Sequence, residues 1–241
     1  MKKALATLAA ALIACPAFAD HTHIVIEDGV FLPSLRGSFD IWPRGEDAPS
    51  APHTGHGVEV GLTGASGKDQ QTRGAGDPAL TFGGQAFAAP STIHYEFDFG
   101  YFELLYRYRH FFGAARTFGI EGVAGLGSAA MEITASTATQ RASDELRSGG
   151  LVLGAGVVWR FRPQTSLQSR ISVFGSGERE GVTSAARFEL LVSHAFTRNI
   201  ALRGGVTSWA VASQRDEDAA SPNSHIRARF GGLALGLDVM F

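Results

Sequence analysis

Three polar side chains that could do chemistry lie at alternate positions in the stretch HYEFD. His94, Glu96 and Asp98 occur at i, i+2 and i+4. Successive strand residues point to opposite faces, so this spacing places all three on one face of a β-strand. A histidine with two carboxylates can bind a divalent metal or take part in acid–base chemistry. The structural alternative is that the carboxylates pair with arginines on neighbouring strands, such as Arg227.

Most of the chain after residue 56 alternates between apolar and polar side chains, which is the pattern of β-strands. The alternation predicts eight strands, in 57–65, 93–112, 117–133, 150–162, 165–175, 184–196, 199–212 and 224–241. It changes phase near Gly100 and slips again at Gly231-Gly232. One residue slipped beside a glycine predicts a β-bulge, which we therefore expect at Gly100.

One face of each predicted strand carries nearly all of its charge. These polar positions are Glu59, Glu96, Asp98, Glu103, Arg107, Arg109, Glu121, Arg160, Arg187, Glu189, Arg203, Arg227, Arg229 and Asp238. If that face lines a narrow interior, acids and arginines should pair there, because an unpaired buried charge is costly. The sequence therefore predicts a charge network that fills the interior. A weak ion path or a catalytic patch is the functional alternative.

The connectors between the predicted strands alternate in length. Tight turns are expected at 113–116, 162–165 and 197–199, and longer loops at 66–91, 134–148, 175–183 and 213–223. Short turns at one end and long loops at the other are typical of transmembrane β-barrels. Aromatic residues gather near the short-turn ends, as in a membrane-interface girdle: Tyr106, Tyr108, Phe111, Phe112, Phe118, Trp159, Phe161, Phe196 and Phe241. The alternative is a soluble β-protein with aromatic residues in its core.

The N-terminus, MKKALATLAAALIACPAFAD, reads as a secretory signal peptide over residues 1–19. Two lysines precede a short apolar run, and AFA at 17–19 is a small-x-small cleavage site. The alternative is lipidation of Cys15, because LIAC resembles a lipobox, although Pro16 argues against it. Cys15 is the only cysteine, so disulfides and thiolate sites are not expected in the exported chain. No later run of 18 apolar residues predicts a transmembrane helix.

Four stretches resemble the small eight-stranded outer-membrane barrels of the OmpA-like and opacity-protein group. They are GIEGVAGLG (119–127), GGLVLGAGVVWRFRPQTSLQSRISV (149–173), HAFTRNIALRGGV (194–206) and GLALGLDVMF (232–241). The last resembles the signal read by the outer-membrane assembly machinery, with Leu233, Leu235, Leu237, Val239 and Phe241 at alternate positions. The resemblance implies an all-β, antiparallel, up-and-down transmembrane barrel over residues 56–241, whose last strand closes against its first.

Residues 20–55 fit this pattern less well. We expect them to form an N-terminal extension that is periplasmic or packs in the lumen. The alternative is that 22–31 and 34–42 add a hairpin, which would raise the strand number from eight to ten. His21 and His23 could hold a metal in this segment, although a simple tail is the plainer interpretation.

Function follows mostly from the resemblance, and two hypotheses stay open. The first is a non-enzymatic, monomeric barrel of the bacterial outer membrane that contacts lipids and lipopolysaccharide and meets an extracellular ligand or host surface through its loops. The second is an enzyme acting on lipid A or phospholipid, with His94, Glu96 and Asp98 near the outer end of the second strand. The formal net charge of −2 argues against a nucleic-acid partner. No phosphate loop, nucleophile elbow or zinc signature is present, so no cofactor or metal is expected.

Overall fold

The computed structural model describes residues 22–26, 29–31, 34–40, 54–177, 181–197, 199–215 and 224–240. The predicted signal peptide, Cys15, His21 and Phe241 lie outside these residues. Within them the chain is all-β, as predicted, and no helix has the length and apolar character that a membrane crossing requires. The strands are β1 (Thr22–Ile26), β2 (Gly29–Phe31), β3 (Ser34–Asp40), β4 (Thr54–Arg73), β5 (Leu80–Phe82), β6 (Gln85–Phe87), β7 (Ser91–Phe112), β8 (Phe118–Ser136), β9 (Arg141–Arg162), β10 (Thr165–Ser176), β11 (Gly181–Ala195), β12 (Ile200–Arg215) and β13 (Ser224–Met240).

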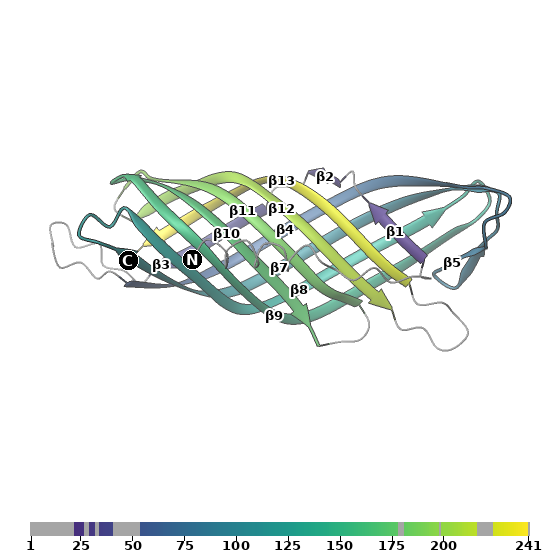
Figure 1. The fold of residues 1–241 in the computed structure, drawn as a ribbon, viewed down its shortest axis with the longest axis horizontal. Coiled ribbons are helices and arrows are strands. Elements are labelled where there is room, and N and C mark those ends of the chain that lie inside the picture. Colours follow the sequence, from purple (N-terminus) through teal and green to yellow (C-terminus); the bar gives the residue numbers. More distant parts are fainter. Residues whose placement is uncertain are drawn as a thin grey trace, which may run out of the picture.

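Nine strands form a ring-like sheet (Figure 1). All eight predicted strands are present, as β4 and β7 to β13, and each pairs antiparallel with the next along the chain. The ninth is β3, which lies between β13 and β4. The expected direct closure of the last strand on the first is therefore wrong, and so are both expected strand numbers.

The closing strand β3 forms because Leu35, Gly37 and Phe39 alternate with Ser34, Arg36 and Ser38. The first set is turned outward and the second is buried. An odd strand number gives β3 the same direction as β13, so these two pair in parallel. β1 continues this parallel pairing further along β13, and β2 pairs antiparallel with β4. The described residues 22–26, 29–31 and 34–40 therefore belong to the sheet and do not form a separate extension.

Short turns join the strands at one end of the ring, as predicted, but the other end differs from the long loops that were expected there. One end has the short connectors 113–117, 163–164 and 196–199, as predicted. At the other end the expected loop 134–148 is mostly strand, because β8 and β9 continue to a turn at 137–140. Its inward residues Ile133, Ala135, Ala142 and Leu146 are buried, and this inward apolar pattern extends both strands. The far end is thus built from long strands more than from long loops.

The predicted bulge at Gly100 and the slip at Gly231-Gly232 are both absent. Gly100 pairs with Gly64 and Ala130 in uninterrupted ladders, and the register of β13 on β12 is equally continuous. What changes at these glycines is polarity. On one side of Gly100, Phe102 faces outward and Glu103 inward; on the other side, Asp98 faces outward and Phe99 inward.

This exchange divides the ring into two sections. The banded section, next to the short turns, has an apolar exterior and comprises 34–40, 56–63, 101–112, 118–128, 150–162, 165–174, 186–195, 200–208 and 232–240. The capped section is the rest of the ring, with a polar exterior and an apolar interior. The boundary between the two sections is marked by small residues that face outward. They are Gly64, Gly100, Ser128, Gly149, Gly175, Ser208 and Gly231.

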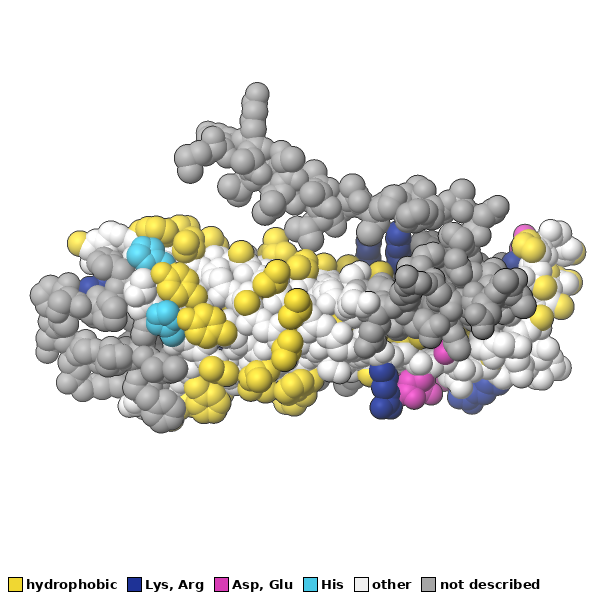
Figure 2. All heavy atoms as spheres, turned by 90° about the horizontal axis from the view of Figure 1, so that it is seen from below, with side chains coloured by type: hydrophobic (Ala, Val, Ile, Leu, Met, Phe, Trp, Pro, Cys, Tyr) yellow, Lys and Arg dark blue, Asp and Glu magenta, His cyan; other side chains and the backbone are white. Residues whose placement is uncertain are grey.

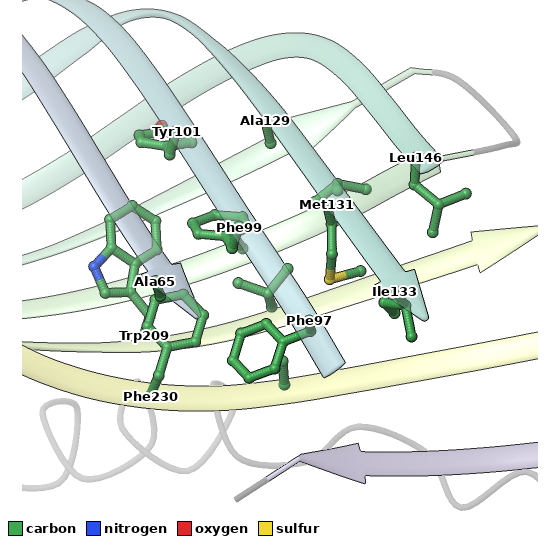
Figure 3. Packing of buried hydrophobic residues seen from close by; sticks show 14 of the residues in the cluster. Ala65, Phe97, Phe99, Tyr101, Ala129, Met131, Ile133, Leu146, Trp209 and Phe230 are labelled. Atoms are coloured by element: carbon green, nitrogen blue, oxygen red, sulfur yellow. The ribbon is translucent and has the colours of Figure 1, made fainter. Parts of the chain in front are cut away.

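Aromatic rings fill the interior where the two sections meet (Figure 3). Trp209 lies 4.9 Å from Tyr101, 5.7 Å from Phe99 and 6.1 Å from Phe230, measured between ring centroids. At the open end, the β5–β6 hairpin folds over this core and buries Leu80, Phe82 and Phe87. The predicted outer loop 66–91 therefore supplies strand residues and a cap, in place of a free loop.

Two adjacent glycines on β12 provide a test of how closely the strands pack. A Cβ on Gly205 would lie 2.0 Å from the backbone oxygen of Leu190, whereas one on Gly204 would meet only Leu235, at 3.8 Å. We expect Gly205→Ala to lower the free energy of unfolding by about 1–3 kcal/mol, because the strands must move apart. Gly204→Ala should leave it equal or slightly higher. Urea unfolding in mild detergent, followed by tryptophan fluorescence, measures both; equal values would contradict the packing.

Candidate functional site: an interior network of arginines and carboxylates

The banded section encloses a cluster of charged side chains. Most of the residues predicted to line the interior are buried there, namely Glu59, Glu103, Arg107, Glu121, Arg187, Glu189, Arg203 and Asp238. Arg109 is partly buried and reaches Glu121. Arg160 lies over the ring of Phe111, with its guanidinium carbon 3.7 Å from the ring centroid.

Two further arginines complete the network, and the sequence reasoning placed neither of them in it. Arg170 lies on the polar face of the predicted strand 165–175, so the alternation already contained the signal. Arg36 lies in the stretch that was assigned to an extension. The alternation of Leu35, Gly37 and Phe39 with Arg36 indicates a strand that turns Arg36 to the opposite face.

Glu59 on β4 is the centre of the network and is completely buried. It accepts hydrogen bonds from Arg107 at 3.0 Å, Arg170 at 2.7 Å and Arg203 at 3.4 Å. Arg36 lies 3.1 Å from the same carboxylate. Four strands other than β4 therefore send an arginine to this one acid.

Arg36 on β3 connects the network across the ring. It donates to Glu103 at 2.8 Å and to Glu189 at 2.7 Å, in addition to its contact with Glu59. Arg187 holds the other oxygen of Glu103 at 3.0 Å. The guanidinium of Arg187 also lies 4.9 Å from the Trp209 ring, a cation–π contact that joins the charged layer to the aromatic one.

The remaining carboxylates are held in the same way. Glu121 contacts Arg109 at 2.5 Å and Arg170 at 3.3 Å. Asp238 contacts Arg203 at 2.8 Å and accepts a hydrogen bond from Ser38. Among the described side chains, six arginines thus surround five carboxylates, and each carboxylate has at least one arginine partner. This pairing offsets the cost of burying charge.

Glycines on the inner face make room for these long side chains. Gly61 lies between Arg36 and Glu103 in register, and Gly156 lies between Arg170 and Glu121. A Cβ on Gly61 would come within 2.7 Å of the Glu103 carboxylate. The interior is therefore filled by side chains, as expected for a ring of about eight strands.

Five residues predicted for the site lie outside the network. Glu96, Asp98, Arg227 and Arg229 were expected to line the interior, but they face outward from the capped section, because Phe97, Phe99, Ala228 and Phe230 take the inward positions. His94 shares the outward face of β7.

The proposed catalytic patch therefore lies on an open, polar surface. Lys68 of β4 pairs with Glu96 at 2.5 Å, and this hydrogen bond lowers the pKa of the Glu96 carboxyl below its usual value. Arg227, the expected partner, lies on β13, which is not a neighbour of β7. Across the described residues, no three His, Cys, Asp or Glu side chains are grouped so as to hold a metal ion.

Exposed apolar side chains lie on every strand of the banded section, and Figure 2 shows them gathered over one face with white atoms between them. This exterior includes residues predicted to form the signal for the outer-membrane assembly machinery. Leu233, Leu235 and Leu237 are 55%, 54% and 43% exposed, and Val239 is partly exposed. Charged side chains gather at the opposite end of the same view. Among described residues, no Asp, Glu, Lys or Arg faces outward between the boundary and the short turns.

Aromatic and histidine rings cluster outside the ring near the short turns. His56 contacts Tyr106 and Tyr108, His110 contacts Phe112, and His194 contacts Phe196. Phe112 stacks on Phe118, and Trp159 contacts Phe161. Of the predicted girdle, Phe111 alone among the described residues is fully buried.

Comparison with known proteins adds no assignment to this geometry. No family model, curated protein or solved structure matches the chain. The function must therefore be argued from the paired interior charges and the apolar exterior alone.

A matched pair of glutamates tests whether the network stabilises the ring. Glu59→Gln removes the acid shared by four arginines and leaves them with excess positive charge, so we expect a loss of about 3–5 kcal/mol in the free energy of unfolding. Glu96→Gln breaks an exposed pair and should leave it nearly unchanged. Urea titration in detergent compares the two; a similar small effect from both would show that the interior pairs add nothing.

Proposed function

We propose that this chain is a β-barrel of the bacterial outer membrane, with a side-chain-filled interior and a structural or surface-binding role. The single observation that carries the proposal is the reversed polarity of the banded section. Its interior holds paired arginines and carboxylates, and its exterior is apolar, with no outward charge among the side chains that the structure describes. In water such a surface would be costly, because each apolar Å² left exposed forgoes about 25 cal/mol of burial.

The height of the apolar band suits a membrane. On β7 it runs from Phe102 to Phe112. Ten residue steps of about 3.4 Å make about 34 Å along the strand, and a strand tilt of about 40–45° reduces this to about 25 Å along the axis. The apolar band of outer-membrane barrels has about this height. A closed ring also satisfies backbone hydrogen bonds without an edge in lipid.

The ends of the band support one orientation. Aromatic and histidine rings near the short turns suit the periplasmic interface, where amphipathic rings collect. The capped section would then stand outside the membrane, with water on its polar exterior. There the apolar interior and polar exterior of an ordinary soluble fold are the stable arrangement.

The proposed route to the membrane rests on the two chain ends. The predicted signal peptide at 1–19 accounts for export, and the alternating apolar residues 233–239 suit recognition by the outer-membrane assembly machinery. The resemblance to the OmpA-like and opacity-protein group supports the same destination. The nine strands depart from the eight of that group, so the proposal extends to the architecture and not to any member's ligand.

A non-enzymatic role suits the described groups best. The interior carboxylates are held by arginines, and His94, Glu96 and Asp98 are spread along an exposed strand face. No observation favours the alternative of lipid A or phospholipid modification. The polar exterior of the capped section, with the β5–β6 hairpin at its end, is the surface that we propose meets an extracellular ligand or host surface.

Two outward positions on β9 test membrane insertion. We expect Val157→Arg, in the middle of the band, to destabilise the inserted ring by about 2–4 kcal/mol, because it places a charge against hydrocarbon. Ser143→Arg, outward in the capped section, should have little effect. Membrane fractionation and the change of gel mobility on boiling measure the folded, inserted fraction. A ring that folds in water would lose nothing on Val157→Arg and would become more soluble, which would overturn the proposal.

A second measurement tests the non-enzymatic role. We expect the lipid A and phospholipid mass spectra of a Gram-negative host to be the same with and without overexpression of the chain. The reason is that the interior carboxylates are held by arginines and Glu96 is paired with Lys68. A new lipid A species that disappears on Glu96→Ala would restore the enzymatic hypothesis.

A further inference from the structure

The pair of β3 and β13 is the one parallel pair among the nine strands of the ring. β3 pairs in parallel with β13 over residues 34–40 and antiparallel with β4 over residues 35–40. β13 and β4 themselves run in opposite directions, as every other pair of sequential neighbours does. If β3 were removed, the two edges left behind would therefore be suited to antiparallel pairing with each other.

The N-terminal strands hold their neighbours by far fewer pairings than the other strands do. β1 pairs only with β13, over five residues, and β2 pairs only with β4, over three. β3 alone holds both sides. By contrast, β4 and β7 are paired over twenty residues. Parallel pairing is also slightly weaker per residue than antiparallel pairing.

Side chains inside the ring supply the rest of the attachment. Arg36 reaches Glu59, Glu103 and Glu189, which come from β4, β7 and β11. Ser38 donates a hydrogen bond to Asp238 and accepts one from Arg107 at 3.1 Å. Ser34 shares a hydrogen bond with Thr63. Arg36 is thus the arginine that the N-terminal strands contribute to the interior network.

Within the network, the arginines and carboxylates of the other strands are equal in number without Arg36. Without Arg36, five arginines remain for the five carboxylates, and each carboxylate still has an arginine partner. The five are Arg107, Arg109, Arg170, Arg187 and Arg203. Glu59 keeps Arg107, Arg170 and Arg203, and Glu103 keeps Arg187. Glu189 and Glu121 keep Arg170, and Asp238 keeps Arg203. These five arginines and five carboxylates would be equal in number in an interior closed by β4 and β13 alone.

We propose that the ring has two closures and that Arg36 selects between them. In one, β3 lies between β13 and β4 and the ring has nine strands. In the other, β13 pairs directly with β4 in a ring of eight strands, and the N-terminal strands are released. Because residues 41–53 join β3 to the start of β4, released strands stay tethered at the short-turn end. Thr22, paired with Ser224 at the capped end in the nine-stranded ring, would leave that end.

This device does not depend on the proposed membrane location, since it concerns how the sheet closes. If the ring does span the outer membrane, the exchange moves the N-terminal strands from the outer surface to the periplasm. The carboxylates that bind Arg36 provide the free energy that keeps the nine-stranded closure. Loss of those contacts should favour the eight-stranded one.

Three leucines give a direct readout of the closure. Leu35 is opposite Leu62 on one side and Leu235 on the other, and all three side chains are more than half exposed. In the nine-stranded ring, Leu62 and Leu235 are two strand spacings apart, about 9.5 Å. A disulfide needs Cβ atoms within about 3.5–4.5 Å, so cysteines at 62 and 235 cannot join there. In the eight-stranded ring β4 and β13 are adjacent.

The experiment uses the full chain with Cys15→Ser, purified in mild detergent and oxidised. Leu35→Cys with Leu62→Cys reports the nine-stranded closure. Leu62→Cys with Leu233→Cys, Leu235→Cys or Leu237→Cys in turn reports the eight-stranded closure in any of three registers. Each pair is made with Arg36, with Arg36→Gln, and with the exposed control Arg229→Gln. Boiled and unboiled gel mobility identifies the folded fraction.

We expect the 35–62 disulfide to dominate with Arg36 and with Arg229→Gln. With Arg36→Gln, one β4–β13 disulfide should rise at least about tenfold in the folded fraction, because loss of a buried ion-pair centre shifts an equilibrium by more than one factor of ten. A folded Arg36→Gln chain that forms only the 35–62 disulfide would overturn the proposal. If Arg36→Gln does not fold, deletion of residues 22–40 decides: a folded chain with a β4–β13 disulfide supports two closures, and an unfolded one refutes them.

Discussion

The structure depends on the pairing of buried arginines and carboxylates inside a narrow ring. Charges taken out of water are tolerated only when a partner of opposite sign replaces the solvent. Glu59 does this with four arginines, and Arg36 does it with three acids. These contacts join strands that are far apart in the ring, so they hold its cross-section. They also fill the interior, with glycines such as Gly61 leaving the necessary room.

A second constraint follows from the length of the strands. β7 carries charges inside and apolar groups outside near the short turns, and the reverse beyond Gly100. One uninterrupted strand can suit two surroundings because its inward and outward residues alternate along the chain. At Gly100 the inward residues change from charged to apolar, and the outward residues change from apolar to polar. The aromatic layer around Trp209 separates the two interiors, and Arg187 contacts both. Under the proposed function, the boundary at Gly64, Gly100 and Gly231 marks where lipid gives way to water.

Much of the fold could be predicted from alternation, and the errors have a common physical cause. The eight long strands were predicted because their faces differ in polarity. The loop predicted at 134–148 failed because its inward residues are small, such as Ala135 and Ala142, and its outward residues are polar. The bulge predicted at Gly100 failed for a related reason: a change of surroundings and a change of register produce the same phase shift in a sequence. Glu96, Asp98, Arg227 and Arg229 were misplaced by that ambiguity.

Three features could be inferred from the residues alone: the alternation along the strands, the charge on one strand face, and the tight turns at one end. Those are local properties, since each depends on residues only a few positions apart. How the ring closes and which charges meet depend on the fold of the whole chain. Arg36 and Glu189 are 153 residues apart, and Arg170 and Glu59 are 111 apart. Such partners are set by strand number and register around the whole ring, and a parallel ninth strand changes both.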